Sequence, residues 1–411
     1  MNRTELLEVI RNGENSGVEF KRDAIDARKL APEIAALLNL EGGHILLGVE
    51  KDGSVSGLNR QSGVAEEWLM QVARDHIQPA VNPYWEVLEP LPGRRVGVIS
   101  LPANAPDKPY KAKRGSAWVT KIRVGTTTRD ATREEEARLY QQSGQLRYGL
   151  KPVPGTTVND LDRRRLRDYF ERILGWDAVD PEDADEWATV LRNLDLAVES
   201  AGTIAATIDG MLIFGENPGR FLPQSGVRAI CYTGQETEHA TRADEQLRGA
   251  LAPLQALDGS LLETGLVDRA LDFVRRNTAP TATLRGARRL DQWEYPAGVI
   301  REVVVNALIH RDYSIAGTDV TLSIFSDRLE IQSPGRLPNT VTVDGMRLGM
   351  RYSRNQTLAN VMRDYGYVEA RGMGIRNKVI PLMRDHNGTV PDLVEGDHHF
   401  TVRLWSHPQA Q

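Results

Sequence analysis

The stretch from Gln141 to Asn159 does most to limit what this chain can fold into, because every regular spacing of apolar residues stops there. It contains three glycines and two prolines, which are residue types that end helices and strands. The chain has 411 residues, more than one hydrophobic core normally organises, since domains cluster near roughly 100 to 200 residues. We therefore expect a domain at residues 1–142, a linker at 143–159, and a second half that begins at residue 160.

The first part of the chain mixes helical and strand patterns, which is typical of an α+β domain. Apolar residues at helical spacing predict a helix at Leu30–Leu40, and a buried strand is expected at His44–Val49. A capping box at Thr132–Glu135 predicts the start of a last helix. The remaining expected elements are a helix near 66–76 and strands near 84–88, 94–101 and 117–124.

The second half divides again near residue 285. Residues 160–284 have mainly helical patterns with one strand near 227–232, and a winged helix is an alternative for this part. Residues 285–411 predict a long helix from Pro296 to His310, then a strand hairpin around Ser326–Asp327, two further helices and a final strand. This order predicts a C-terminal α/β sandwich, and we expect the whole chain to be an α+β multidomain protein.

Charge is distributed unevenly along the chain. The formal net charge is -5, which does not favour a protein that coats nucleic acid by bulk attraction. Between Arg94 and Arg129, however, nine residues are basic and one, Asp107, is acidic. This run predicts a basic patch able to contact phosphates, although a solvated face of a sheet would have the same composition.

The composition excludes several other classes of protein. The single cysteine, Cys231, excludes an internal disulfide and a metal site built from several thiolates. The longest apolar runs, such as His44–Val49 and Met211–Phe214, are far shorter than the roughly 20 residues of a membrane span. The first residues also lack the pattern of a signal peptide, so we expect a cytoplasmic protein without a membrane partner.

Acidic residues surround the first predicted strand. Alternation along that strand places Glu19 and Lys21 on one side, while Glu14 lies just before it, and Glu50 and Asp52 follow the next strand. Clustered carboxylates are suited to hold Mg²⁺ or Mn²⁺ for phosphodiester cleavage, and Lys21 would offset charge in the transition state. The alternative is a surface ion pair between Glu19 and Lys21, with Glu14 in a solvated loop.

A predicted helix of the C-terminal part carries a polar stripe. Glu302, Asn306 and His310 follow one another at intervals of four residues, so they share one helix face. An Asn amide oxygen can bind the Mg²⁺ of a nucleoside triphosphate, and a Glu one turn earlier can orient water toward it. In isolation, the stripe also fits an exposed helix face with a buried Asn bonded to the backbone. A glycine-rich loop that leads into a helix, and so could cradle phosphates, contains Arg371, Gly372 and Gly374.

Four sequence motifs taken together resemble the Schlafen AlbA-type domain. They are ENSGVEFK at 14–21, IAALLNLEGGHILLGVE at 34–50, KPY at 108–110 and IRVGTTT at 122–128. The resemblance implies nucleic-acid binding and, as in Schlafen nucleases, a metal-dependent endoribonuclease site that acts on structured RNA such as tRNA. Glu14, Glu19 and Glu50 match the three acids of that site. The nucleases usually have Asp at the third position, whereas Glu50 is longer by one methylene group, and Asp52 is the nearby alternative. Whether the domain cleaves nucleic acid or only binds it, the phosphate contacts are expected at Lys108, Lys111, Lys113, Arg114, Arg123, Thr126 and Thr127.

Residues 295–405 resemble the GHKL ATPase domain, a Bergerat-type α/β sandwich, in the divergent form found behind AlbA-type domains. The matching motifs are the Asn306 helix, HRDY at 310–313, DRLEI at 327–331, SPG at 333–335, RN at 354–355, and Glu369 with the glycines that follow it. Ser333 stands where the family usually has the Asp that bonds adenine, and a hydroxyl makes that bond less selectively. The resemblance implies that ATP binds at Glu302, Asn306, His310, Ser333, Gly335, Arg371, Gly372 and Gly374.

Three functions remain open from the sequence. The first is an ATP-responsive, metal-dependent endoribonuclease of the bacterial Schlafen type, acting in phage defence or stress. The second is a non-catalytic transcriptional regulator that binds DNA and senses ATP. The third is an ATPase module whose N-terminal domain binds a protein partner. RNA and DNA are both open as targets, and ATP is either hydrolysed or only sensed. A homo-oligomer is among the possible oligomeric states.

Overall fold

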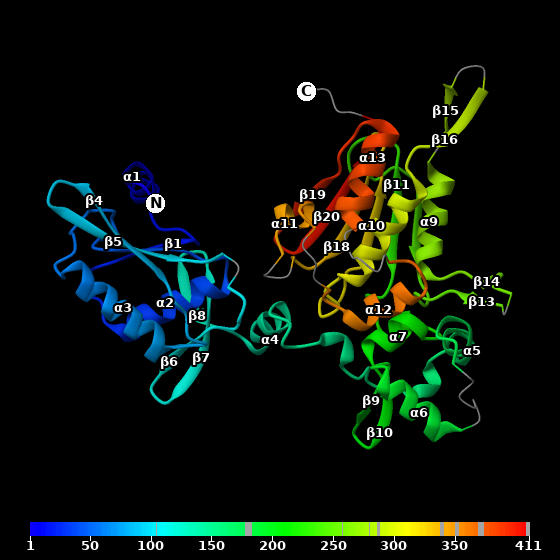
Figure 1. The fold of residues 1–411 in the computed structure, drawn as a ribbon, viewed down its shortest axis with the longest axis horizontal. Coiled ribbons are helices and arrows are strands. Elements are labelled where there is room, and N and C mark those ends of the chain that lie inside the picture. Colours follow the sequence, from blue (N-terminus) through cyan, green and yellow to red (C-terminus); the bar gives the residue numbers. More distant parts are fainter. Residues whose placement is uncertain are drawn as a thin grey trace. The chain divides into compact units, whose positions relative to one another are not determined.

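The computed structural model of the protein describes residues 1–103, 105–176, 183–256, 258–278, 280–285, 288–337, 341–349, 353–368 and 374–407. The chain folds as two compact units, Met1–Leu146 and Arg147–Gln411, and the division falls inside the predicted linker (Figure 1). Each unit combines helices with sheets, so the predicted α+β multidomain architecture is confirmed. None of the helices in the described parts of the chain has the length and apolar content that a membrane span requires.

The N-terminal unit contains two four-stranded sheets, with strand orders β1-β2-β5-β4 and β3-β6-β7-β8. Strands β1 and β2 pair in parallel, and the other neighbours in these sheets are antiparallel. The elements of this unit are α1 (Arg3–Asn12), β1 (Val18–Lys21), α2 (Ala27–Asn39), β2 (Gly43–Leu47), α3 (Ser62–His76), β3 (Ile77–Gln78), β4 (Tyr84–Leu91), β5 (Arg94–Leu101), β6 (Lys111–Arg114), β7 (Ala117–Val124), β8 (Thr127–Asp130) and α4 (Arg133–Gln142).

Helix α2 is the central element of this unit, because it contacts strands of both sheets. Asp26 caps its N-terminus by accepting a hydrogen bond from the backbone N–H of Lys29. Leu30, Ile34 and Leu37 are fully buried at the spacing that the sequence predicted. Burying each such side chain contributes roughly 1.5 to 3 kcal/mol, so α2 holds the two sheets together.

A glycine pair sets where β2 begins. Gly42 and Gly43 have φ angles of +71° and +138°, which side chains other than glycine rarely adopt. A Cβ atom on Gly43 would overlap the carbonyl oxygen of Gly17, and one on Gly42 would overlap that of Leu101. Gly43 therefore lets β2 lie directly beside β1, and Gly42 lets the chain pass close to the end of β5. In the register of β1 with β2, Glu19 is the partner of Ile45.

The C-terminal unit is organised around a six-stranded sheet of order β12-β11-β17-β18-β20-β19, against which helices α9 and α10 pack. Its elements are η1 (Tyr148–Leu150), η2 (Val158–Asp160), α5 (Arg163–Asp168), η3 (Tyr169–Ile173), α6 (Ala184–Asn193), β9 (Ala197–Ser200), β10 (Thr203–Ala206), α7 (Ile208–Phe214), α8 (Pro218–Phe221), β11 (Val227–Tyr232), β12 (Thr241–Leu247), β13 (Leu254–Gln255), β14 (Leu261–Glu263), α9 (Leu266–Asn277), β15 (Pro280–Arg285), β16 (Arg288–Trp293), α10 (Ala297–Ile309), β17 (Val320–Ile324), β18 (Arg328–Pro334), α11 (Val343–Arg347), α12 (Gln356–Asp364), η4 (Ile375–Val379), α13 (Ile380–Asn387), β19 (Asp392–Glu395) and β20 (His399–Trp405).

The predicted division between residues 160–284 and 285–411 does not separate two compact units. Strand β11, from the first of these segments, pairs in parallel with β17, from the second, and Cys231 is the partner of Ile324. One hydrophobic core also runs through both segments. The first segment is less helical than expected, since it contributes strands β9 to β14 and the start of β15. Local patterns do not show which strands pair, so a shared sheet was missed.

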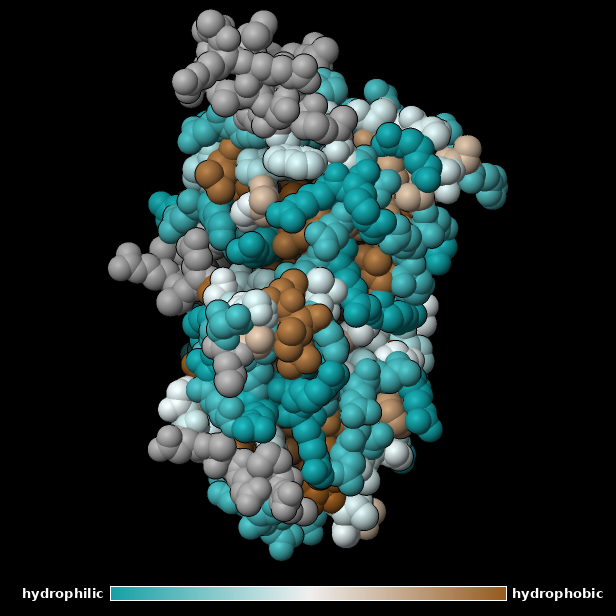
Figure 2. All heavy atoms as spheres, turned by 90° about the vertical axis from the view of Figure 1, so that its right-hand side faces the viewer, coloured by the Kyte–Doolittle hydropathy of each residue, from teal (hydrophilic) through white to brown (hydrophobic). Residues whose placement is uncertain are grey.

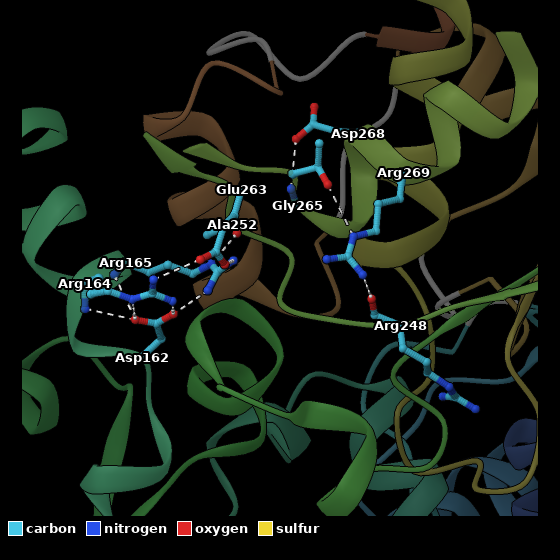
Figure 3. Close-up of polar contacts among 10 residues, drawn as sticks. Asp162, Arg164, Arg165, Arg248, Ala252, Glu263, Gly265, Asp268 and Arg269 are labelled. Atoms are coloured by element: carbon cyan, nitrogen blue, oxygen red, sulfur yellow. Dashed lines mark hydrogen bonds and ion pairs between the residues drawn. The ribbon is translucent and has the colours of Figure 1, made fainter. Parts of the chain in front are cut away.

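A buried arginine ties α5 to the chain that precedes α9 (Figure 3). Arg165 Nε donates to the carbonyl oxygen of Ala252 at 3.1 Å, and its Nη2 donates to Glu263 at 2.8 Å. Its Nη1 pairs with Asp162, which is the N-cap of α5. These contacts give Arg165 a structural role.

The surface of the face drawn in Figure 2 is mainly hydrophilic, with apolar residues in separate patches.

Candidate functional site

Glu19 is the centre of a buried ion-pair network in the N-terminal unit. It lies on β1, and 7% of its side chain is exposed. Its Oε2 accepts a hydrogen bond from Arg123 Nη2 at 2.6 Å, and its Oε1 accepts one from Lys21 Nζ. Arg123, on β7, has a fully buried side chain and also donates to the carbonyl oxygens of Asn15 and Val18, at 3.0 and 3.2 Å. Both carboxylate oxygens of Glu19 are therefore held by protein cations.

Glu33, on α2, completes this network. Its Oε1 lies 3.2 Å from Lys21 Nζ, and its Oε2 accepts a hydrogen bond from Thr128 Oγ1 at 2.5 Å and lies 3.3 Å from Arg123 Nη1. Two carboxylates thus face two cations. Burial alone would lower the pKa of Lys21, but the hydrogen bonds and charges of Glu19 and Glu33 outweigh it and raise the pKa above its usual value.

No sequence motif singled out Glu33, but a signal was present. It is the only charged residue between Leu30 and Leu40. A carboxylate on an otherwise apolar helix requires a partner, because an unpaired buried charge is strongly unfavourable. The pattern therefore indicated that Glu33 meets a cation, although not which one.

Each of the other predicted acids has a hydrogen-bond or ion-pair partner of its own. Glu14 Oε1 accepts a hydrogen bond from the backbone N–H of Phe20 at 2.9 Å, so Glu14 does lie beside β1. Glu50, in contrast, pairs with the largely exposed Arg22 at 2.6 Å. Asp52 Oδ1 accepts hydrogen bonds from the Ser54 hydroxyl and backbone N–H, which lower the Asp52 pKa. Glu50 and Asp52 do not form a shared metal site with Glu19 in the described residues, because Glu50 pairs with Arg22 and Asp52 is bonded to Ser54 in its own turn.

The donor set as arranged does not fit a divalent cation. Metal binding by several carboxylates requires free oxygen atoms that point to one position. The Glu19 oxygens are both occupied by cationic groups, and within the described ranges no group of three His, Cys, Asp or Glu side chains is placed to share an ion. A metal at Glu19 would have to displace Lys21 or Arg123.

Most of the predicted phosphate-binding cations are also paired. Lys108 is buried and donates to the Leu40 carbonyl oxygen, and Arg123 is buried in the Glu19 network. Thr126 and Thr127 are exposed at the turn between β7 and β8. The surface ion pairs are Lys111 with Glu136 at 2.9 Å, Arg114 with Asp130 at 2.8 Å, Lys121 with Asp130, and Arg129 with Glu135 at 2.8 Å.

These pairs explain why the charge run overstated the basic patch. The acids that neutralise it follow immediately after the counted stretch, at Asp130, Glu135 and Glu136, and fold back onto it. The hydrogen bonds from Arg129 are strong enough to lower the pKa of Glu135 to about 2. The ammonium groups of Lys111 and Lys113 also lie over aromatic rings, those of Tyr140 and Trp118 respectively.

In the C-terminal unit, the structure brings the predicted helix and glycine loop together. Asn306 Nδ2, on α10, donates to Oε1 of the buried Glu302 at 3.1 Å. A Cβ atom on Gly374 would overlap that same Glu302 oxygen, so the end of the glycine loop lies directly against α10. Lys378 Nζ, which no motif indicated, lies 3.7 Å from Glu302 Oε2. The predicted loop residues Arg371 and Gly372 lie outside the described residues.

Three further predicted residues lie at the C-terminal end of α10. Ser333 is buried and its hydroxyl donates to the carbonyl oxygen of Ala307 at 2.7 Å. Gly335 has a φ of +107°, and a Cβ there would overlap Arg354, whose Nη1 donates to the His310 carbonyl oxygen at 3.1 Å. Burial of the His310 ring, with the Arg354 charge nearby, lowers its pKa to about 4 even though part of the residue reaches the surface. His310 is therefore neutral at physiological pH.

Two family models match parts of the chain. Residues 14–132 match the model described as "Schlafen, AlbA_2", and residues 317–404 match HATPase_c_4, described as "Putative ATP-dependent DNA helicase recG C-terminal". The first span contains every predicted acid and phosphate contact of the N-terminal unit. The second contains Ser333, Gly335 and the glycine loop but begins after Glu302, Asn306 and His310.

Two solved structures are similar to the chain. The DIP2311 protein from Corynebacterium diphtheriae is 21% identical, with a TM-score of 0.46, over 98% of this chain and 80% of that one. The N-terminal domain of a RecG-related protein from Nitrosomonas europaea is 20% identical, with a TM-score of 0.26, over 32% of this chain and 94% of that domain. No curated protein matches the sequence.

Proposed function

We infer that this chain, which carries a Schlafen AlbA_2 domain at residues 14–132 and a HATPase_c_4 domain at residues 317–404, is a cytoplasmic protein that binds nucleic acid and senses ATP. Nucleic acid would bind to the N-terminal unit, and the nucleotide would bind between α10 and the glycine loop. In this function the N-terminal unit binds without cleaving, as a transcriptional regulator does.

One observation carries the choice of binding over cleavage, namely that Lys21 and Arg123 hold both oxygens of Glu19. Glu19 would be one ligand of a nuclease metal site, since it matches the second acid of the Schlafen motif. Removing a buried carboxylate from two cations is unfavourable, because the cations would lose their partner in a poorly solvated position. The ion pairs therefore favour a structural role for Glu19.

The second candidate is a metal-dependent endoribonuclease that acts on structured RNA such as tRNA. It is supported by the position of Glu14, which accepts a hydrogen bond from the backbone N–H of Phe20, so Glu14 lies beside the strand that carries Glu19. When bound, Mg²⁺ or Mn²⁺ would polarise the phosphate and activate water. In this arrangement Lys21 or Arg123 would have to release Glu19 before the ion could bind.

Incubation of the purified protein with labelled tRNA and with duplex DNA, in Mn²⁺ or in EDTA, separates the two candidates. The binding function predicts complexes in both conditions and intact nucleic acid. Cleavage that requires Mn²⁺, is lost in Glu14→Gln and Glu19→Gln, and persists in the exposed control Glu8→Gln would establish the nuclease instead. Thermal melting of each variant shows whether a lost activity reflects a lost fold.

The nucleotide site has its own test, because Asn306 donates to Glu302 and Gly374 lies against the same Glu302 carboxylate. We expect Asn306→Ala to abolish ATP binding measured by calorimetry in the presence of Mg²⁺. Asn360→Ala, on the exposed face of α12, is the matched control and should bind ATP as the wild type does. Equal affinities of the two variants would contradict the assignment.

A further inference from the structure

The tip of the β6–β7 hairpin exposes an aromatic side chain beside a cation. Lys113 on β6 and Trp118 on β7 are direct cross-strand partners, so their side chains leave the same face of the ribbon. The Lys113 ammonium nitrogen lies 5.8 Å from the centre of the Trp118 ring. Trp118 is 37% exposed, and all residues from Lys113 to Trp118 are exposed. In Figure 1 the hairpin reaches past α3 at the lower edge of its unit. We call Lys113 and Trp118 the hairpin platform.

Among the described residues, the positive charge of Lys113 is not neutralised by a carboxylate, as the charges of the neighbouring cations are. Lys111, Arg114 and Lys121 each have a carboxylate partner. Within the described part of the chain, Lys113 has no carboxylate at ion-pair distance, and its contact is the Trp118 ring. The neighbouring Arg114 is next in sequence and so projects from the opposite face, where Asp130 holds it. The hairpin platform therefore presents one positive charge next to a partly exposed indole ring.

An aromatic ring beside a lysine matches the chemistry of a single nucleotide. The indole can stack on the face of a base, and the ammonium can pair with the adjoining phosphate. Inside a duplex both faces of each base are covered by its neighbours, whereas an unpaired base offers its face to a protein side chain. An acidic peptide would use the lysine but would gain little from the indole.

We propose that the hairpin platform stacks on an unpaired base, so that the AlbA_2 domain binds single-stranded segments or unpaired ends in preference to uninterrupted duplex. This inference rests on the proposed binding of nucleic acid by the N-terminal unit. It adds the class of nucleic acid and names Trp118, which no motif indicated, as the residue that selects it.

The test uses full-length protein, fluorescein-labelled oligouridine, and a blunt RNA duplex of the same length. We expect Trp118→Ala to weaken binding of the single strand at least about tenfold and that of the duplex by less than about twofold. Trp118→Phe should retain most of the affinity, because phenylalanine also stacks. Tyr84→Ala is the matched control, since Tyr84 is a 64% exposed aromatic on the other sheet of the same unit and should have no effect.

A second variant tests the cation, and a second readout tests the stacking. Lys113→Gln should reduce the dependence of log affinity on log salt concentration by about 0.7, as expected for the loss of one phosphate contact to a single strand. Stacking should also quench tryptophan fluorescence when oligouridine is added, and Trp118→Phe should remove that part of the quenching.

The outcomes separate failure of the platform from failure of the proposed function. If the wild type binds neither oligonucleotide, the proposed nucleic-acid binding is wrong, and the proposed role of the hairpin platform is wrong as well. If the wild type binds both oligonucleotides but Trp118→Ala binds oligouridine as tightly as the wild type does, the platform alone is wrong. Competition by polyglutamate that depends on Trp118 as strongly as oligouridine binding does would also overturn the inference, in favour of an acidic protein partner.

Discussion

Replacing Arg123 with methionine tests the ion-pair network directly. Arg123 has a side-chain exposure of 0% and its partner Glu19 one of 7%, so the substitution would leave a buried carboxylate with Lys21 alone. Removing one partner of a buried ion pair typically lowers the free energy of unfolding by roughly 3 to 5 kcal/mol. The lost hydrogen bonds to the carbonyl oxygens of Asn15 and Val18 add to this effect. We expect a loss at the upper end of that range.

Arg129→Met is the matched control, because Arg129 also pairs with one glutamate but its side chain is 45% exposed. Such surface pairs contribute about 0 to 1 kcal/mol. Hydrogen exchange measured by mass spectrometry on peptides from β1 and β7 would report the stability of the N-terminal unit separately from the rest of the chain. Adding Glu19→Leu to Arg123→Met should recover part of the loss, since no buried charge is then left unpaired. Equal losses in the two single variants would refute the buried network.

Two further predictions concern the C-terminal unit. Gly374→Ala should weaken ATP binding at least about tenfold in calorimetry, because its Cβ would overlap the Glu302 carboxylate. Gly298→Ala on α10 is the control and should bind ATP normally, since its Cβ would be 3.5 Å from the nearest atom. Unchanged ATP affinity in Gly374→Ala would contradict the contact. Burial raises the pKa of Asp209 to about 7 from an ordinary value of 3.8, so the folded state holds this proton more tightly than the unfolded state. The free energy of unfolding should therefore decrease as the pH rises from about 4 to about 7, by up to about 4 kcal/mol. Asp209→Asn should remove this pH dependence in urea unfolding. A wild-type profile identical to that of Asp209→Asn would show that Asp209 is not the cause.

Local patterns predicted the elements of the N-terminal unit well. The helix expected at Leu30–Leu40 is α2, and the strand expected after the glycine pair is β2. Both were predictable because helical spacing, caps and glycine turns act over a few residues. The close approach of Glu302, Asn306 and Gly374 followed partly from the i, i+4 spacing and partly from the resemblance to an ATPase motif.

The features that were missed depend on contacts between distant residues. Glu33 is 90 positions from Arg123, and nothing near it in the sequence indicates that partner. The basic run lost most of its charge to acids just beyond the counted stretch, because β8 and α4 fold back onto β6 and β7. The shared sheet of the C-terminal unit depends on parallel pairing of β11 with β17, which leaves no mark on the spacing of apolar residues in either strand.

We propose that the AlbA_2 domain binds nucleic acid while Glu19 remains paired with Lys21 and Arg123. The most direct measurement is the dissociation constant of labelled tRNA in excess EDTA and in Mn²⁺, with the integrity of the RNA checked on a denaturing gel. We expect the same dissociation constant in both conditions and intact RNA. Binding that appears only with Mn²⁺, or RNA fragments that form with Mn²⁺ and not in Glu19→Gln, would contradict the claim.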